Sequence, residues 1–109
     1  MQYRLFFRRK AKTMQDQFVV YPIKIKPTGE NSSNYLVYLP DFQGYTLGED
    51  YDNALFMARD YIGTRSLFNK LPPASKRLPL VGGSETALFI KVNITSFRLQ
   101  HGVRANGHL

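Results

Sequence analysis

The sequence predicts an α+β domain of two layers, in which a three-stranded antiparallel meander and a returning fourth strand form a sheet covered by one helix. Apolar and polar residues alternate in residues 18–26, 35–39 and 86–97, as in strands with one buried face. Between the second and last of these segments, apolar residues recur every three or four positions, as in a helix. The expected order is therefore β-β-β-α-β.

The first strand, residues 18–26, places Tyr21, Ile23 and Ile25 on one face. Pro22 cannot donate a backbone hydrogen bond, which predicts an edge position or a strand end. A loop rich in turn residues separates this strand from the next, so we expect the two to form a hairpin.

A turn follows the second strand at Pro40-Asp41-Phe42-Gln43-Gly44, where proline fixes φ and glycine can adopt the left-handed conformation. A short third strand, residues 45–47, leads to a helix with Asp50 as its expected N-cap. The helix continues until Pro72-Pro73 forbids it. Its expected apolar stripe consists of Ala54, Leu55, Ala58, Tyr61 and Ile62.

Residues 71–84 contain three prolines and two glycines and predict an irregular crossing loop. We expect the fourth strand, residues 86–97, to lie beside the first strand by the usual right-handed return. Residues 18–99 then form the domain, between a flexible arm at residues 1–17 and a flexible tail at residues 100–109.

The composition excludes several classes of site. The 109 residues are 43% hydrophobic, enough for one core, and the absence of cysteine excludes disulfides and thiolate metal ligands. No apolar run is long enough to span a membrane and no secretory signal is recognisable, so the sequence predicts a soluble, cytoplasmic protein.

The net charge of +7 is concentrated at the N-terminus. Its first thirteen residues hold five basic side chains and no acidic one: Arg4, Arg8, Arg9, Lys10 and Lys12. Three interpretations stay open for this arm: a frayed extension upstream of Met14, a basic arm for nucleic acid or an acidic partner, and an extra edge strand.

Three motifs in this order resemble the N-terminal domain of the HicB family. They are Tyr21-Pro22, then Tyr35-x-Val37-x-Leu39-Pro40-Asp41-Phe42-x-Gly44, then Glu49-Asp50-x-Asp52-x-Ala54-Leu55-x-x-Ala58. The resemblance covers about residues 18–99. It implies a partial ribonuclease-H-like fold without nuclease activity, and the role of an antitoxin that binds a HicA-like, mRNA-cleaving toxin in a prokaryotic toxin–antitoxin pair.

The chain departs from the family pattern in three respects. Tyr45 follows Gly44 where the family often has cysteine, and the N-terminal arm is basic although an inhibitor of an RNA-binding toxin should present acidic groups. The sequence also ends shortly after the last predicted strand, so we expect no C-terminal DNA-binding domain.

No catalytic constellation is recognisable, so we expect no enzyme, no metal site and no cofactor. Under the antitoxin hypothesis, acidic groups at the turn and helix start mimic RNA phosphate while aromatic residues anchor the partner. The predicted partner-binding residues are Tyr38, Asp41, Phe42, Tyr45, Glu49, Asp50 and Asp52. Capping and solvation remain the simpler explanation for the acidic ones.

The alternative is a solitary HicB-family protein that binds RNA through the basic arm and through tyrosines that stack on bases. Its predicted contact residues are Arg4, Arg8, Arg9, Lys10, Lys12, Lys24, Lys26, Lys76 and Arg77. In both cases an edge strand and an uncovered sheet face predict a homodimer.

Overall fold

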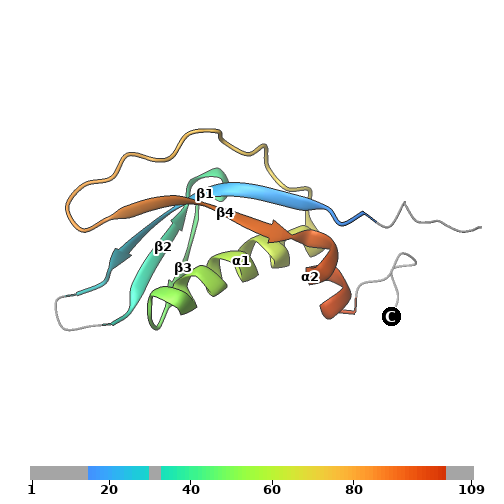
Figure 1. The fold of residues 1–109 in the computed structure, drawn as a ribbon, viewed down its shortest axis with the longest axis horizontal. Coiled ribbons are helices and arrows are strands. Elements are labelled where there is room, and N and C mark those ends of the chain that lie inside the picture. The colour runs from blue at the N-terminus through green and yellow to red at the C-terminus, as the bar shows by residue number, and fades with distance from the viewer. Residues whose placement is uncertain (1–14, 30–32, 103–109) are drawn as a thin grey trace, which may run out of the picture.

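The computed structural model describes residues 15–29 and 33–102, which form an α+β fold of two layers (Figure 1). Strands β1 (Phe18–Pro27), β2 (Tyr35–Leu39) and β3 (Gly44–Gly48) precede helix α1 (Tyr51–Phe68). Strand β4 (Thr86–Asn93) and helix α2 (Ile94–Gln100) follow it. The predicted class and the order β-β-β-α-β are confirmed, and α2 is an addition.

The four strands form one antiparallel sheet in the order β3-β2-β1-β4. The predicted hairpin pairs Ile25 with Val37, and β2 pairs with β3 so that Tyr38 lies opposite Tyr45. Strand β4 lies beside β1 as expected. It runs antiparallel to β1, however, so the handedness rule for parallel returns does not explain its position.

Pro22 lies inside a central strand, which corrects its predicted place at an edge or strand end. It pairs with Phe89 of β4, whereas the ladder between β1 and β2 covers only Lys24 to Pro27. Pro22 therefore has a paired residue in β4 and none in β2. The strand tolerates the missing donor because β2 has already ended there.

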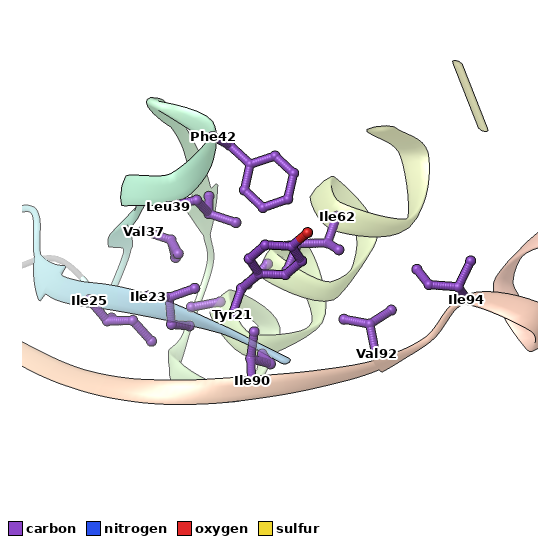
Figure 2. Packing of buried hydrophobic residues seen from close by; sticks show 12 residues of the cluster. Tyr21, Ile23, Ile25, Val37, Leu39, Phe42, Ile62, Ile90, Val92 and Ile94 are labelled. Atoms are coloured by element: carbon purple, nitrogen blue, oxygen red, sulfur yellow. The ribbon is translucent and has the colours of Figure 1, made fainter. Parts of the chain in front are cut away.

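The core lies between the sheet and α1 (Figure 2). The predicted inward residues Tyr21, Ile23 and Ile25 are almost fully buried. Burial of an isoleucine or leucine side chain contributes about 1.5–3 kcal/mol, so this cluster holds the layers together. Its other members are Val37, Leu39, Phe42, Ala54, Ala58, Ile62, Ile90, Val92 and Ile94.

Helix α1 begins as the sequence predicts. The Asp50 carboxylate accepts a hydrogen bond from the backbone N–H of Asn53 at 2.7 Å, and Asp52 lies in the first turn. Of the predicted stripe, Ala54, Ala58 and Ile62 are fully buried. The two alanines are small enough to let the helix lie close to the sheet.

The segment between α1 and β4 is long because of the direction of β4. The chain leaves α1 at one end of the sheet and has to return to the opposite end before β4 can start (Figure 1). Residues 69–85 make this return on the side of the sheet opposite α1. We call them the crossing loop.

The fourth strand is shorter than predicted. It ends at Asn93, whose side-chain oxygen accepts from the N–H of Ser96 at 2.8 Å and so caps α2. Ile94 continues the alternation of the strand, although it is the first residue of α2 and is buried there. The sequence pattern therefore does not show where the strand ends and the helix begins. The ring of Phe97 occupies the place that a Cβ on Gly63 would need, so this glycine lets α2 pack on α1.

Residues just outside both expected boundaries of the domain make contacts with residues inside it. The backbone N–H of Gln17 donates to the Thr95 hydroxyl at 2.8 Å, and Asp16 accepts from Asn93. At the other end, the ring of His101 stacks on Phe97 with centroids 4.1 Å apart. Neither of the described helices is long and apolar enough to cross a membrane.

Candidate binding surfaces

The turn between β2 and β3 is a single turn of 3-10 helix at Pro40–Phe42. Its left-handed residue is Gln43 (φ 51°), which corrects the expectation that Gly44 adopts this conformation. Gly44 has a different role, because a Cβ at this position would overlap the Tyr61 hydroxyl. The glycine therefore allows close packing of β3 on α1.

Asp41 holds the crossing loop. Its carboxylate accepts hydrogen bonds from both the backbone N–H (2.8 Å) and the hydroxyl of Ser75. Nearby, the buried Tyr21 hydroxyl donates to the carbonyl of Pro72 at 2.6 Å. Burial raises the pKa of Tyr21, and the negative charge of Asp41 adds to this effect. Together the two contacts tie the start of the crossing loop to the sheet.

We expect Asp41→Ala to lower the free energy of unfolding by about 0.5–1.5 kcal/mol, the net contribution of a typical hydrogen bond, since the exposed Ser75 amide exchanges its carboxylate partner for water. Hydrogen exchange at that amide should become faster, and chemical denaturation measures the stability. Ser84→Ala, in an exposed part of the same loop, is the control. Unchanged protection of the Ser75 amide would contradict this role of Asp41.

Phe42, predicted to anchor a partner, lies in the core with 8% of its surface exposed. Its ring packs edge-on against Tyr21 at a centroid distance of 4.7 Å (Figure 2). A second edge-on contact joins it to Tyr61 at 5.7 Å. The 3-10 turn directs the side chain inward, because the strand alternation ends at Leu39. Phe42 therefore supports the turn from inside and offers little surface to a partner.

The acidic group at the start of α1 is partly structural. Asp50 is the N-cap, whereas the exposed carboxylates of Glu49 and Asp52 make no hydrogen bond or ion pair within residues 15–29 and 33–102. The backbone N–H of Glu49 donates to the side chain of Asn53 at 2.9 Å, which holds the entry to the helix. Glu49 and Asp52 are thus available to a partner.

The sheet face opposite α1 carries exposed apolar residues, and we call it the open face. The register places Tyr38 beside Tyr45 and Leu36 beside Leu47. Tyr45 and Leu47 are 60% and 58% exposed. The register also places Pro22 on this side of the sheet, where it is fully buried. The other residues that the register places on this face are Phe18, Val20, Lys24, Lys26, Ala87, Phe89 and Lys91.

A hollow of about 270 Å³ lies on the open face, and its lining includes residues from both the predicted partner-binding set and the predicted nucleic-acid-binding set. Lys24 ion-pairs with Glu85 at 3.7 Å and donates to the carbonyl of Leu80 at 3.4 Å. The Gly82 N–H and then the neighbouring lysines lower the pKa of Glu85, so its carboxylate stays charged. The hollow is lined by Lys24, Lys26, Leu36, Tyr38, Tyr45 and Glu85.

The remaining predicted basic residues do not gather at one site. Lys76 and Arg77 are exposed in the crossing loop. The basic residues of the arm lie outside the described residues: Arg4, Arg8, Arg9, Lys10 and Lys12. The predicted set thus contributes only Lys24 and Lys26 to the hollow.

Two exposed features were not expected from the sequence. Leu47 belongs with Tyr45 because the register pairs it with Leu36, and Leu80 of the crossing loop is 92% exposed. The alternation of residues 45–47 indicates that Leu47 lies on the same face as Tyr45, but only the strand order shows that both lie on an edge strand. No local pattern marks the second.

Within residues 15–29 and 33–102, no three histidine, aspartate or glutamate side chains lie close enough to hold a metal ion. The expectations of a non-enzymatic protein and of a homodimer stay predictions. Strands β3 and β4 are the two edges at which a further chain could pair.

Comparison of the chain with protein-family models, curated proteins and solved structures gives no match in any of the three. The fold and its surfaces define a two-layer α+β domain with an apolar, lysine-bearing open face and an acidic helix start.

Proposed function

We propose that this domain is a non-catalytic protein-binding module of the antitoxin type, which acts in the cytoplasm. Its partner is a HicA-like, mRNA-cleaving toxin, as the resemblance to the HicB family implies. The observation that supports this function best is an edge strand with exposed apolar residues that leads directly into acidic groups with no partner in the described part of the chain. We call these residues the β3 edge surface: Tyr45, Leu47, Glu49 and Asp52.

The composition of the β3 edge surface suits a protein partner. Tyr45 and Leu47 are both more than half exposed on an outer strand of the sheet. Exposed apolar groups with a polar rim mark interaction sites, and tyrosine is enriched in the cores of interfaces. The surface therefore offers both apolar contact area and polar contacts at its margin.

Charge favours an RNA-binding toxin as the partner. A protein that binds RNA presents basic residues to the phosphates, and Glu49 and Asp52 carry the complementary charge without internal partners among the described residues. Asp41 and Phe42 are left out of the contact set, since the first binds Ser75 and the second is buried. They support the turn that carries β3.

The finer fold assignment, a partial ribonuclease-H-like domain of the HicB type, is part of the same proposal. The order β-β-β-α-β and the place of β4 beside β1 support it. The antiparallel direction of β4 differs from the parallel return that the crossover rule describes. The helix α2 is a further feature of this chain.

Co-expression with the small basic protein encoded beside this gene, followed by pull-down and a growth assay, tests the function. We expect a complex and relief of toxicity. Glu49→Lys combined with Asp52→Lys should weaken the complex by at least about tenfold, because it places like charges opposite the toxin. Isothermal titration measures the affinity.

Asp60→Lys reverses one charge on α1, two turns beyond Asp52, and should leave the affinity within about twofold of the native value. Circular dichroism of each variant checks that α1 is intact. A gene neighbourhood without a small basic reading frame, or no complex with its product, would refute the antitoxin function. Equal affinities of all variants would show that the acidic residues of the β3 edge surface do not contact the toxin.

A further inference from the structure

We propose that the open face binds single-stranded nucleic acid, with one base stacked on Tyr45 and the backbone held by Lys24 and Lys26. The site is separate from the acidic end of the β3 edge surface and requires no toxin. It is also distinct from the basic arm, since all three residues lie within the folded sheet.

The tyrosines provide a stacking platform. Tyr38 and Tyr45 lie opposite each other on neighbouring strands, with ring centroids 4.8 Å apart and an angle of 34° between the rings. Tyr45 is 60% exposed, so part of its ring is open to a ligand. Aromatic rings on the open face of a four-stranded sheet are one of the recurring ways in which proteins bind single-stranded RNA bases.

The charges of the open face favour an anionic ligand. Three lysines lie on it, Lys24, Lys26 and Lys91, and Glu85 is the acidic residue that lines the hollow together with Lys24 and Lys26. Glu85 pairs with Lys24, whereas the exposed ammonium of Lys26 makes no hydrogen bond or ion pair with another described residue. A phosphate can therefore bind Lys26 without breaking an existing contact.

The ring beside the lysines distinguishes a nucleic acid from an acidic peptide. The Lys24 ammonium lies 5.9 Å from the centroid of Tyr38, so charge and ring surface occur in one place. A nucleotide carries a phosphate and a flat base together and uses both groups. The hollow of about 270 Å³ falls just below the range of roughly 300–1,000 Å³ for pockets of drug-sized ligands, which suits one planar group at a time.

Fluorescence anisotropy of a labelled short oligouridylate with the full chain tests this site. We expect Tyr45→Ala to weaken binding by at least about fivefold, the lower end of what one stacked base contributes. Tyr45→Phe keeps the ring and should bind within about twofold of the native chain. Lys26→Gln should reduce the slope of log affinity against log salt by about 0.7, the value for one phosphate contact.

Two controls match these changes. Phe56 is as exposed as Tyr45, at 60%, but lies on α1, so Phe56→Ala should not alter binding. Lys70, exposed beyond the end of α1, is the control for Lys26. Because every variant keeps the basic arm, its contribution is constant and the differences report the open face.

Several outcomes would overturn the proposal. Equal binding by the native chain and Tyr45→Ala would assign the affinity to non-specific charge. Equal binding of duplex RNA would exclude base stacking, and preferential binding of a polyglutamate peptide would assign the face to an acidic protein. A comparison with oligodeoxythymidylate distinguishes RNA from DNA as the ligand. Loss of toxin binding in Glu49→Lys with Asp52→Lys, without loss of oligouridylate binding, would separate this site from the proposed function.

Discussion

Replacement of Ile23 by alanine is expected to lower the free energy of unfolding by about 2–5 kcal/mol. Ile23 is completely buried in β1, which lies between β2 and β4, and it belongs to the core between the sheet and α1 (Figure 2). The substitution removes three carbon atoms and leaves a cavity that the close-packed neighbours can fill only in part. Urea denaturation followed by circular dichroism measures the change.

The control for this substitution lies three residues away in the same strand. Val20 is 43% exposed on the open face, so Val20→Ala should change the free energy of unfolding by less than about 1 kcal/mol. Similar losses for both variants would show that the two faces of β1 are not divided between core and solvent as described.

Replacement of Gly48 by alanine is expected to cost about 3 kcal/mol, the upper part of the usual range for overpacking. A Cβ at Gly48 would overlap the backbone N and Cα of Ala54, in the first turns of α1. Backbone atoms cannot turn aside as a flexible side chain can, so β3 and α1 would have to separate. Thermal unfolding should show the loss as a lower midpoint.

Gly82→Ala provides the matched control, because nothing lies within 4 Å of a Cβ at this position of the crossing loop. Its stability should stay within about 0.5 kcal/mol of the native value. Gly48→Ala should also weaken toxin binding, since Leu47 and Glu49 are its neighbours in the chain. A stable Gly48→Ala variant would contradict the close approach of β3 to α1.

The two proposed surfaces meet at Tyr45 and differ in charge. Glu49 and Asp52 lie at the start of α1, while Lys24 and Lys26 lie on the sheet face turned away from it. A basic protein and an anionic polymer are therefore directed to different parts of the same domain. Competition between oligouridylate and toxin would then arise at Tyr45 alone.

Local patterns predicted much of the fold. The alternation of Tyr21, Ile23 and Ile25 identified the buried face of β1, because successive side chains of a strand point to opposite sides. Asp50 was identified as the N-cap because a short acidic side chain just before an apolar stripe satisfies the first free amides of a helix. Both predictions depend on neighbours in sequence.

The incorrect predictions have both local and tertiary causes. Ile94 continues the alternation of β4, yet the Asn93 side chain caps α2 and ends the strand there. Pro22 is tolerated in a central strand because β2 ends before it. The left-handed residue of the turn is Gln43, whereas Gly44 begins β3 and packs against Tyr61.

The residues of the candidate sites could also be predicted only in part. The sequence indicated Tyr38, Tyr45 and the lysines of β1 as contact residues, and it could not indicate which of them would share a hollow. It also grouped Asp41 and Phe42 with the surface residues, although one binds Ser75, thirty-four positions away, and the other packs in the core.

By itself, the sequence determined the class of the fold, the order of its first elements, the buried face of β1 and the start of α1. These features follow from side-chain periodicity and capping, which act over a few residues. Only the tertiary structure decided the direction of β4, the path of the crossing loop, and the rows that bring Lys24 beside Tyr38 and Tyr45. Strand register and loop contacts join residues far apart in the chain, and no local pattern encodes which of them will meet.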